Sequence, residues 1–209
     1  MATRNGTYGQ YIGSTIGESM ALSSLEMGVN ASYIYRYFHS KGWSNKAIAS
    51  ILGNMSVESS LNPGRWQSDN VNNLDGGYGL VQWTPATNYI NWCANNGIVD
   101  YSEMDSNLAR IQYEFDNNLQ WISTDSYPIS FEEFSKSNES IEYLTTAFLK
   151  NYERAGVEHL ETRINYSNMW YEGMQDYDDN DYPDIPDTPS TSIKKKKGFN
   201  FILFKRKRY

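Results

Sequence analysis

The chain of 209 residues has one cysteine, two histidines and no long apolar run, and each scarcity excludes a kind of protein. Cys93 alone cannot form an intrachain disulfide framework, and it leaves too little sulfur for a cysteine-ligated metal site. Two histidines, His39 and His159, are too few for a histidine-rich zinc centre, and we interpret both as surface residues at helix ends. No stretch approaches the ~20 apolar residues of a membrane span. We therefore expect no metal, no cofactor and no transmembrane helix.

Residues 1–28 also lack the features of an export signal. They are rich in Gly, Ser and Thr, and no continuous apolar stretch follows a basic start. We interpret residues 1–28 as an arm that is flexible or becomes ordered on a partner.

Charge is divided between two segments of the chain. All 25 acidic residues lie before Ser190, whereas the residues beyond it carry eight of the 18 Lys and Arg residues. Residues 176–191 are acidic and rich in proline, without a periodicity that could bury a face, so we predict a disordered linker there. The folded domain is expected to cover residues 29–175.

Residues 192–209 place the apolar segment Phe199–Phe204 between two basic clusters. A solvated chain end would explain the lysine run alone, but the apolar segment favours a docking tail. Three partners fit this pattern, namely an anionic membrane surface, an acidic protein and the edge of a neighbouring sheet. Because the preceding body is acidic, we expect no specific nucleic-acid partner.

Apolar periodicity predicts a mainly α (α+β) protein. Ser44 has the position of an N-cap before a helix whose apolar stripe runs from Ala47 to Met55, and this helix must end before Pro63. Gly76–Trp83 has the glycine and aromatic content of a turn and a short strand, so we expect a small β hairpin there. Further helices are predicted over residues 30–41, from the N-cap Thr84 and Pro85 onward, and over residues 102–117, 130–135, 138–153 and 161–171, the last presenting Ile164, Met169 and Trp170.

Glu58 is the first candidate for chemistry, because it lies in the last turns of the predicted helix that begins after Ser44. A carboxylic acid beside apolar groups can keep its proton near neutral pH and protonate a leaving glycosidic oxygen. On spacing alone the alternative stays open that Glu58 is a solvated residue near a helix end.

The aromatic content also allows two interpretations. The chain has 17 Tyr, 6 Trp and 8 Phe, and aromatic rings either fill a core or stack on the apolar face of a sugar. Trp66, Tyr78 and Trp83 cluster in sequence around the proposed cleft, and both interpretations stay open for them.

Several segments resemble one family. The run Gly53–Gln67 resembles the end of the catalytic helix in the phage tail lysozyme family, part of a lysozyme-like superfamily that includes goose-type lysozymes and lytic transglycosylases. Tyr78–Pro85 resembles the hairpin of that family, and Phe148–Arg154 resembles its late helix. Val29–Tyr33 is similar to the first long helix of podovirus tail-tip proteins that degrade the cell wall. The resemblance covers residues 26–175, and it implies a lysozyme-like helical domain.

The resemblance further implies cleavage of the β-1,4 bond between N-acetylmuramic acid and N-acetylglucosamine in peptidoglycan, with Glu58 as the general acid. Ser59 would shape the turn after the helix, and Gln82 would hydrogen-bond the sugar. Tyr152 and Glu153 would line the opposite wall of the cleft. The residues expected to bind substrate are Ser59, Trp66, Tyr78, Gln82, Trp83 and Tyr152.

The number of catalytic carboxyls stays open. Retaining and inverting glycosidases use two, whereas a substrate-assisted enzyme needs only the acid, because the N-acetyl group acts as the nucleophile. Asp75 and Glu153 are the candidates for a second carboxyl, and Asp69 lies in the same loop as Asp75. We favour a single essential acid, and hydrolysis and transglycosylation remain alternatives.

These inferences predict a virion protein at the tail tip of a bacteriophage that opens the host cell wall locally for genome entry. Peptidoglycan glycan strands would be the substrate, and the C-terminal tail would dock onto other tail-tip proteins. The alternatives are a non-catalytic structural or plug protein with a lysozyme-like fold, and an endolysin or lytic transglycosylase that acts on the same bond.

Overall fold

The protein is described by a computed structural model over residues 1–174. It is mainly helical with a two-stranded antiparallel sheet, which confirms the predicted fold class. The predicted linker over residues 176–191 and the docking tail over residues 192–209 lie outside the described residues. The elements in chain order are β1 (Ala2–Gly6), β2 (Gly9–Gly13), α1 (Ser24–Ser40), α2 (Asn45–Ser59), η1 (Gln67–Asp69), α3 (Thr87–Asn95), α4 (Met104–Asp116), α5 (Phe131–Lys136), α6 (Ile141–Phe148), η2 (Leu149–Glu153) and α7 (Leu160–Met174).

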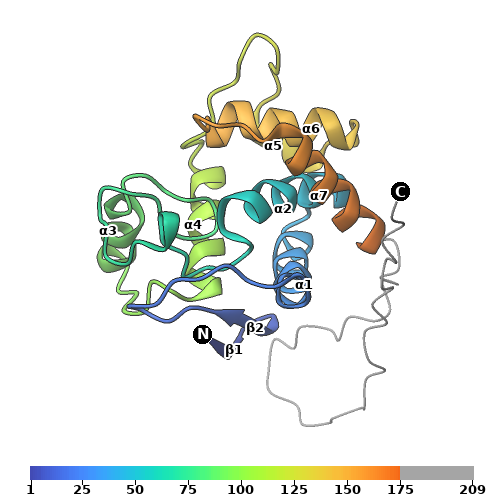
Figure 1. The fold of residues 1–209 in the computed structure, drawn as a ribbon. Coiled ribbons are helices and arrows are strands. Elements are labelled where there is room, and N and C mark those ends of the chain that lie inside the picture. Colours follow the sequence, from blue (N-terminus) through green and yellow to red (C-terminus); the bar gives the residue numbers. More distant parts are fainter. Residues whose placement is uncertain (175–209) are drawn as a thin grey trace. The chain divides into compact units, whose positions relative to one another are not determined.

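Helix α2 forms the centre of the described fold, where it packs against α1, α5, α6 and α7 (Figure 1). Ser44 is its N-cap, as predicted, and the Ser44 hydroxyl accepts a hydrogen bond from the Ala47 N–H at 3.1 Å. The apolar side chains from Ala47 to Met55 are fully buried. After its first two residues, α2 becomes partly accessible to solvent only in the last turn, at Val57 and Glu58.

The chain leaves α2 through a tight left-handed turn. Ser60 and Leu61 have φ angles of 54° and 56°. Asn62 then fixes the turn, because its side-chain oxygen accepts from the backbone N–H groups of Ser14 and Gly64, each at 3.0 Å. The N-terminal segment therefore braces the chain directly after the helix that carries Glu58.

Residues 2–13 were expected in a flexible arm, but in the structure they form the β1–β2 hairpin. Arg4 in β1 pairs with Asp100 at 2.5 Å. Asp105 accepts from the Tyr33 hydroxyl and from the Thr7 N–H, which ties the hairpin to α1 and α4. These partners are distant in sequence and leave no local pattern, which is why the sequence indicated flexibility.

The segment predicted to form a hairpin at Gly76–Trp83 is a compact loop with isolated bridges, in which Tyr78 pairs with both Trp66 and Trp83. Helix α3 begins at Thr87, so the predicted start at Thr84 and Pro85 is wrong. The Ala86 N–H still donates to the Gly76 carbonyl, so the chain up to Ala86 belongs to the loop.

The helix predicted over residues 138–153 is divided into α6 and the π-helical turn η2. The Arg154 N–H donates to the carbonyl of Leu149, five residues earlier, so one extra residue is accommodated in the turn. This widening changes which side chains face inward at the end of the helix. Tyr152 is buried and Glu153 is half-buried as a result.

Helix α7 packs on α2 with partly polar contacts: of the predicted Ile164, Met169 and Trp170, none is fully buried, and Trp170 donates from its indole N–H to the Ser56 hydroxyl of α2 at 2.9 Å. The buried residues of α7 are Arg163, Ser167 and Met174. Gly53 of α2 permits this contact, because a Cβ atom there would lie 1.9 Å from the Ser167 hydroxyl. The close approach of the two helices brings Arg163 to the end of α2.

Candidate functional site

A cavity of about 750 Å³ opens at the C-terminal end of α2. One wall comes from the loop between α2 and α3, and the opposite wall comes from η2 and the segment that leads into α7. Glu58 lines this cavity with 17% of its side chain exposed. The other lining residues are Val57, Arg65, Trp66, Gln67, Ser68, Val81, Gln82, Trp83, Thr84, Asn88, Gln120, Tyr152, Glu153, Arg154, Ala155, Gly156, Val157, His159 and Arg163.

Glu58 is paired with a buried arginine. Arg163 is 1% exposed, and its Nη2 donates to Glu58 Oε1 at 2.5 Å. Its Nη1 donates to the side-chain oxygen of Asn54 at 3.1 Å, and its Nε donates to the Glu158 carbonyl at 2.7 Å. The guanidinium is therefore held in one orientation, with one donor directed at Glu58. Among the described residues, none donates a hydrogen bond to Glu58 Oε2.

Glu153 supplies a second carboxyl to the same cavity. Its Oε1 atom is buried and has no hydrogen-bond partner among the described residues. Burial raises the pKa of Glu153 well above its usual range, the negative charge of Glu58 raises it further, and Arg163 opposes the shift. A buried carboxyl without a partner is costly in its charged form, so Glu153 favours its protonated form.

Together these groups place two carboxyls and one buried guanidinium in one cleft. Arg163 can balance one negative charge, and two carboxyls that interact strongly lose their protons as a pair rather than independently. Glu153 therefore keeps its proton in a pH range where isolated glutamates are ionised, while Glu58 is paired with Arg163. Such a cleft can donate a proton to a bound substrate.

The wall formed by the loop between α2 and α3 contains the predicted aromatic residues, but they are buried. Trp66 and Trp83 line the cavity with 1% and 6% of their surface exposed, whereas Tyr78 is fully buried and is not among the lining residues within the described chain. Tyr78 packs edge-on against Trp66, and Trp83 stacks on Tyr89 with ring centroids 4.5 Å apart. These contacts favour the interpretation of Tyr78 as a core residue.

Gln82 lines the cleft in a conformation that the loop imposes. Its φ angle is 51°, and its side-chain NH₂ donates to the carbonyls of Arg65 and Gly79 at 3.1 and 2.9 Å. The side-chain oxygen of Gln82 accepts no hydrogen bond from the described residues, so it can accept one from a ligand.

Ser59 and Asp75 are not brought into the cleft lining formed by the described residues. The Ser59 hydroxyl donates to the carbonyls of Met55 and Leu80 at 3.1 and 2.9 Å, so it ties the end of α2 to the adjoining loop. Asp75 is exposed. Asp69 is also exposed and pairs with Arg65 at 2.8 Å.

Sequence reasoning missed two residues that organise the cleft. Arg163 was not singled out, because its burial depends on the contact between α2 and α7. Glu114 in α4 was also missed, although it is 1% exposed and accepts hydrogen bonds from Trp83 and Tyr152. In the sequence both are charged residues within helices, a pattern typical of solvated faces, so no local signal separates them.

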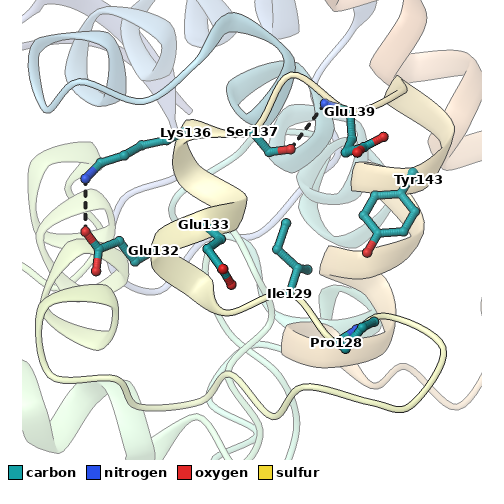
Figure 2. A pocket seen from close by; sticks show the side chains of 8 residues that line it. All are labelled: Pro128, Ile129, Glu132, Glu133, Lys136, Ser137, Glu139 and Tyr143. Carbon is teal, nitrogen blue, oxygen red and sulfur yellow. Dashed lines mark hydrogen bonds and ion pairs between the residues drawn. The ribbon is translucent and has the colours of Figure 1, made fainter.

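A second hollow of about 570 Å³ lies beside α5 and α6 (Figure 2). Its charged side chains are exposed, and Lys136 pairs with Glu132 at 3.0 Å. Unlike the cleft, it contains no buried polar atom without a partner among the described residues.

Neither a metal-binding group of side chains nor a membrane-spanning helix is found in residues 1–174. This part of the chain contains no group of three or more His, Cys, Asp or Glu side chains arranged to hold a metal ion. None of its helices combines the length and apolar character that crossing a membrane requires.

Comparison with known proteins identifies the family to which the chain belongs. The sequence profile described as phage tail lysozyme matches residues 29–174, which include all the residues that line the cleft. Over 151 residues the chain is 45% identical to a protein of Bacillus phage B103 named morphogenesis protein 1, a match that covers 72% of this chain and 40% of that protein. The chain thus spans less than half the length of this relative. On this evidence the chain belongs to the phage tail lysozyme family, as a lysozyme-like phage tail protein.

Proposed function

We propose that the protein is a peptidoglycan glycosidase that cleaves the β-1,4 bond between N-acetylmuramic acid and N-acetylglucosamine, with Glu58 as the general acid. The observation that carries the proposal is the pairing of two carboxyls with one buried guanidinium in a single cleft. A general acid must hold a proton at working pH, and this arrangement keeps one.

In the proposed reaction, Glu58 gives its proton to the glycosidic oxygen while the bond from that oxygen to the sugar C1 breaks. Glu153, whose pKa is raised, can return a proton to Glu58 after turnover. Hydrolysis is completed when water adds its hydroxide to C1 and leaves its proton on the carboxyl pair. If the 6-hydroxyl of the same sugar attacks C1 instead and leaves its proton on the carboxyl pair, the product is an anhydro sugar and the enzyme is a transglycosylase.

The cleft lining suits a sugar chain. Trp66 and Trp83 line the cleft from one wall and Tyr152 from the other, and Gln82 has an acceptor oxygen for an N–H or O–H of the substrate. Polar side chains surround them at Gln67, Ser68, Thr84 and Asn88. Such a mixture of aromatic and polar groups is typical of sites that bind hydroxyl-rich ligands.

Replacing the carboxyl of Glu58 with an amide tests the proposed chemistry. Glu58→Gln keeps a hydrogen-bond acceptor for Arg163 but cannot donate an acidic proton. We expect the variant to fold with a near-native circular dichroism spectrum and to lose at least about 10³-fold of the rate at which purified cell walls clear. Unchanged clearing by folded Glu58→Gln would reject the assignment.

We further propose that the protein acts from the virion, at the tail tip, during genome entry. The family of tail lysozymes and the name of the B103 relative support this placement. The basic residues 192–209 would dock onto other tail-tip proteins, and an anionic membrane surface is the alternative partner. Deletion of residues 190–209 should remove the protein from purified particles without abolishing wall clearing by the isolated protein.

Two other functions give different results in the same experiments. A structural or plug protein would be present in particles, and Glu58→Gln particles would infect as well as wild-type particles. An endolysin would be absent from purified particles, whether or not residues 190–209 are present. The unpartnered carboxyl of Glu153 favours the enzyme over the structural protein, because a binding role gives no reason to retain this cost.

A further inference from the structure

Glu114 of α4 is a buried carboxyl close to the cleft but outside it. It is 1% exposed, and it is not among the described residues that line the cavity. Its Oε1 accepts from Trp83 Nε1 at 3.0 Å and from Arg110 Nε at 2.9 Å. Its Oε2 accepts from the Tyr152 hydroxyl. One side chain therefore joins α4, the loop before α3 and the π-helical turn η2.

The chemistry of the three partners explains why a carboxylate stands here. An indole N–H, a guanidinium N–H and a phenol O–H are all donors, and an ionised carboxylate is a pure acceptor with two oxygens. Glutamine would offer one acceptor oxygen and would direct an NH₂ group at one of the donors. The charge of Arg110 also balances the buried charge of Glu114.

The two residues that Glu114 holds across the cleft each adjoin a residue of the proposed site. Trp83 follows Gln82 directly, and Tyr152 precedes Glu153 directly. Trp83 and Tyr152 themselves line the cavity from opposite walls. Any displacement of these two rings therefore moves the backbone that carries Gln82 and Glu153.

We propose that Glu114 is a positioning residue that fixes the two walls of the cleft relative to each other, through Trp83 and Tyr152. It does not touch substrate, and its effect on the reaction rests on the function proposed above. Catalysis is sensitive to such positioning, because a displacement of about 1 Å far from the reacting atoms can lower a rate by about 10²-fold.

The test uses the full chain with two variants of the contact and one control. Glu114→Gln changes the acceptor, and Tyr152→Phe removes only the donor hydroxyl. Tyr33→Phe removes a comparable buried hydroxyl, which donates to Asp105 away from the cleft. Thermal unfolding is measured for each, together with kcat and KM on soluble glycan fragments of peptidoglycan.

We expect kcat/KM to fall at least about 10-fold in Glu114→Gln and in Tyr152→Phe, and to stay within about 2-fold of wild type in Tyr33→Phe. The double variant Glu114→Gln/Tyr152→Phe should be no less active than the less active of the two single variants, because both substitutions break the same contact. Full activity of either contact variant, or additive losses in the double variant, would overturn the positioning role.

The indole resonances supply a readout that does not depend on turnover. The Trp83 N–H signal, assigned by its loss in Trp83→Phe, should shift in both contact variants and stay in place in Tyr33→Phe. An unshifted signal in Glu114→Gln would also overturn the proposal. A wild-type protein that folds and shows no turnover at all would instead remove the proposed function, and the catalytic role of Glu114 with it.

Discussion

Glu114 and Glu153 both lie near Tyr152 in one wall of the cleft, but their surroundings differ. Glu114 accepts three hydrogen bonds and does not line the cavity, whereas Glu153 lines the cavity and has a buried oxygen without a partner among the described residues. Burial raises the pKa of both carboxyls. Hydrogen bonds from Tyr152 and Trp83 and the charge of Arg110 oppose the shift at Glu114, whereas at Glu153 the shift is opposed by the charges of Arg163 and Arg154 without any hydrogen bond.

The difference distinguishes a structural role, at Glu114, from the proposed role of Glu153 in proton transfer. A buried charged group whose donors are all in place stabilises the arrangement around it, as Glu114 does. A buried carboxyl without donors costs stability, and such a cost is expected where a proton must be held for a reaction. The two residues therefore predict different responses to the same Glu→Gln exchange.

Of the exchanges at these two residues, Glu153→Gln is expected to have the larger effect, because it removes the carboxyl that can return a proton to Glu58 in the proposed reaction. Wall-clearing activity should fall by about 10²-fold, and the loss of one carboxyl should change the pH profile of kcat. Glu114→Gln should lower kcat/KM without changing the shape of that profile. Identical profiles for wild type and Glu153→Gln would break the comparison.

Stability gives an independent test at Glu153. A glutamate whose folded pKa is raised binds its proton more tightly in the folded state, so its contribution is full at low pH and is lost as pH rises above the usual glutamate range. The Glu153→Gln variant has no ionisable carboxyl at this position, so it does not lose this stability as pH rises. Its unfolding temperature relative to wild type should therefore rise between pH 5 and pH 8, by about 2–4 °C for each kcal/mol regained. A constant difference would contradict the raised pKa.

A moderate effect is expected from Gly53→Ala, which acts on the Arg163 guanidinium that pairs with Glu58. A Cβ at Gly53 would lie 1.9 Å from the Ser167 hydroxyl and 2.6 Å from the Arg163 carbonyl, so α7 must move away from α2. We expect a loss of about 1–3 kcal/mol in urea unfolding and a fall in clearing activity. Gly173→Ala is the matched control, because a Cβ there meets nothing within 4 Å. Equal behaviour of the two variants would refute the close-contact account of Arg163.

The smallest effect is expected in the hollow beside α5 and α6. Lys136→Gln breaks the exposed pair with Glu132, and exposed pairs of this kind contribute less than about 1 kcal/mol. Activity and unfolding temperature should both stay at wild-type values. A loss of clearing activity in this variant would show that the cleft does not hold all of the functional groups.

The parts of the fold with local signals could be predicted from the sequence. Ser44 caps α2 and the apolar stripe that follows is buried, because a cap and a helical period are written within a few residues of each other. Glu58 could be placed at the end of this helix for the same reason. The hairpin at residues 2–13 could not, because its anchors at Asp100 and Asp105 lie far along the chain.

The surroundings of Glu58 were equally inaccessible to sequence reasoning. Arg163 reaches Glu58 only because two helices meet closely at Gly53, and Glu114 reaches Tyr152 only because η2 is π-helical rather than α-helical. Both depend on the packing of segments distant in sequence. A single chain thus reveals the candidate acid, but not the groups that set its charge and position.

Mass spectrometry of the soluble products from purified cell walls tests the central claim most directly. Wild-type protein should release fragments that end in muramic acid, either with a reducing end or as the anhydro form, and Glu58→Gln should release none. Fragments whose reducing end is N-acetylglucosamine, cleavage within the peptide, or equal release by Glu58→Gln would contradict the account.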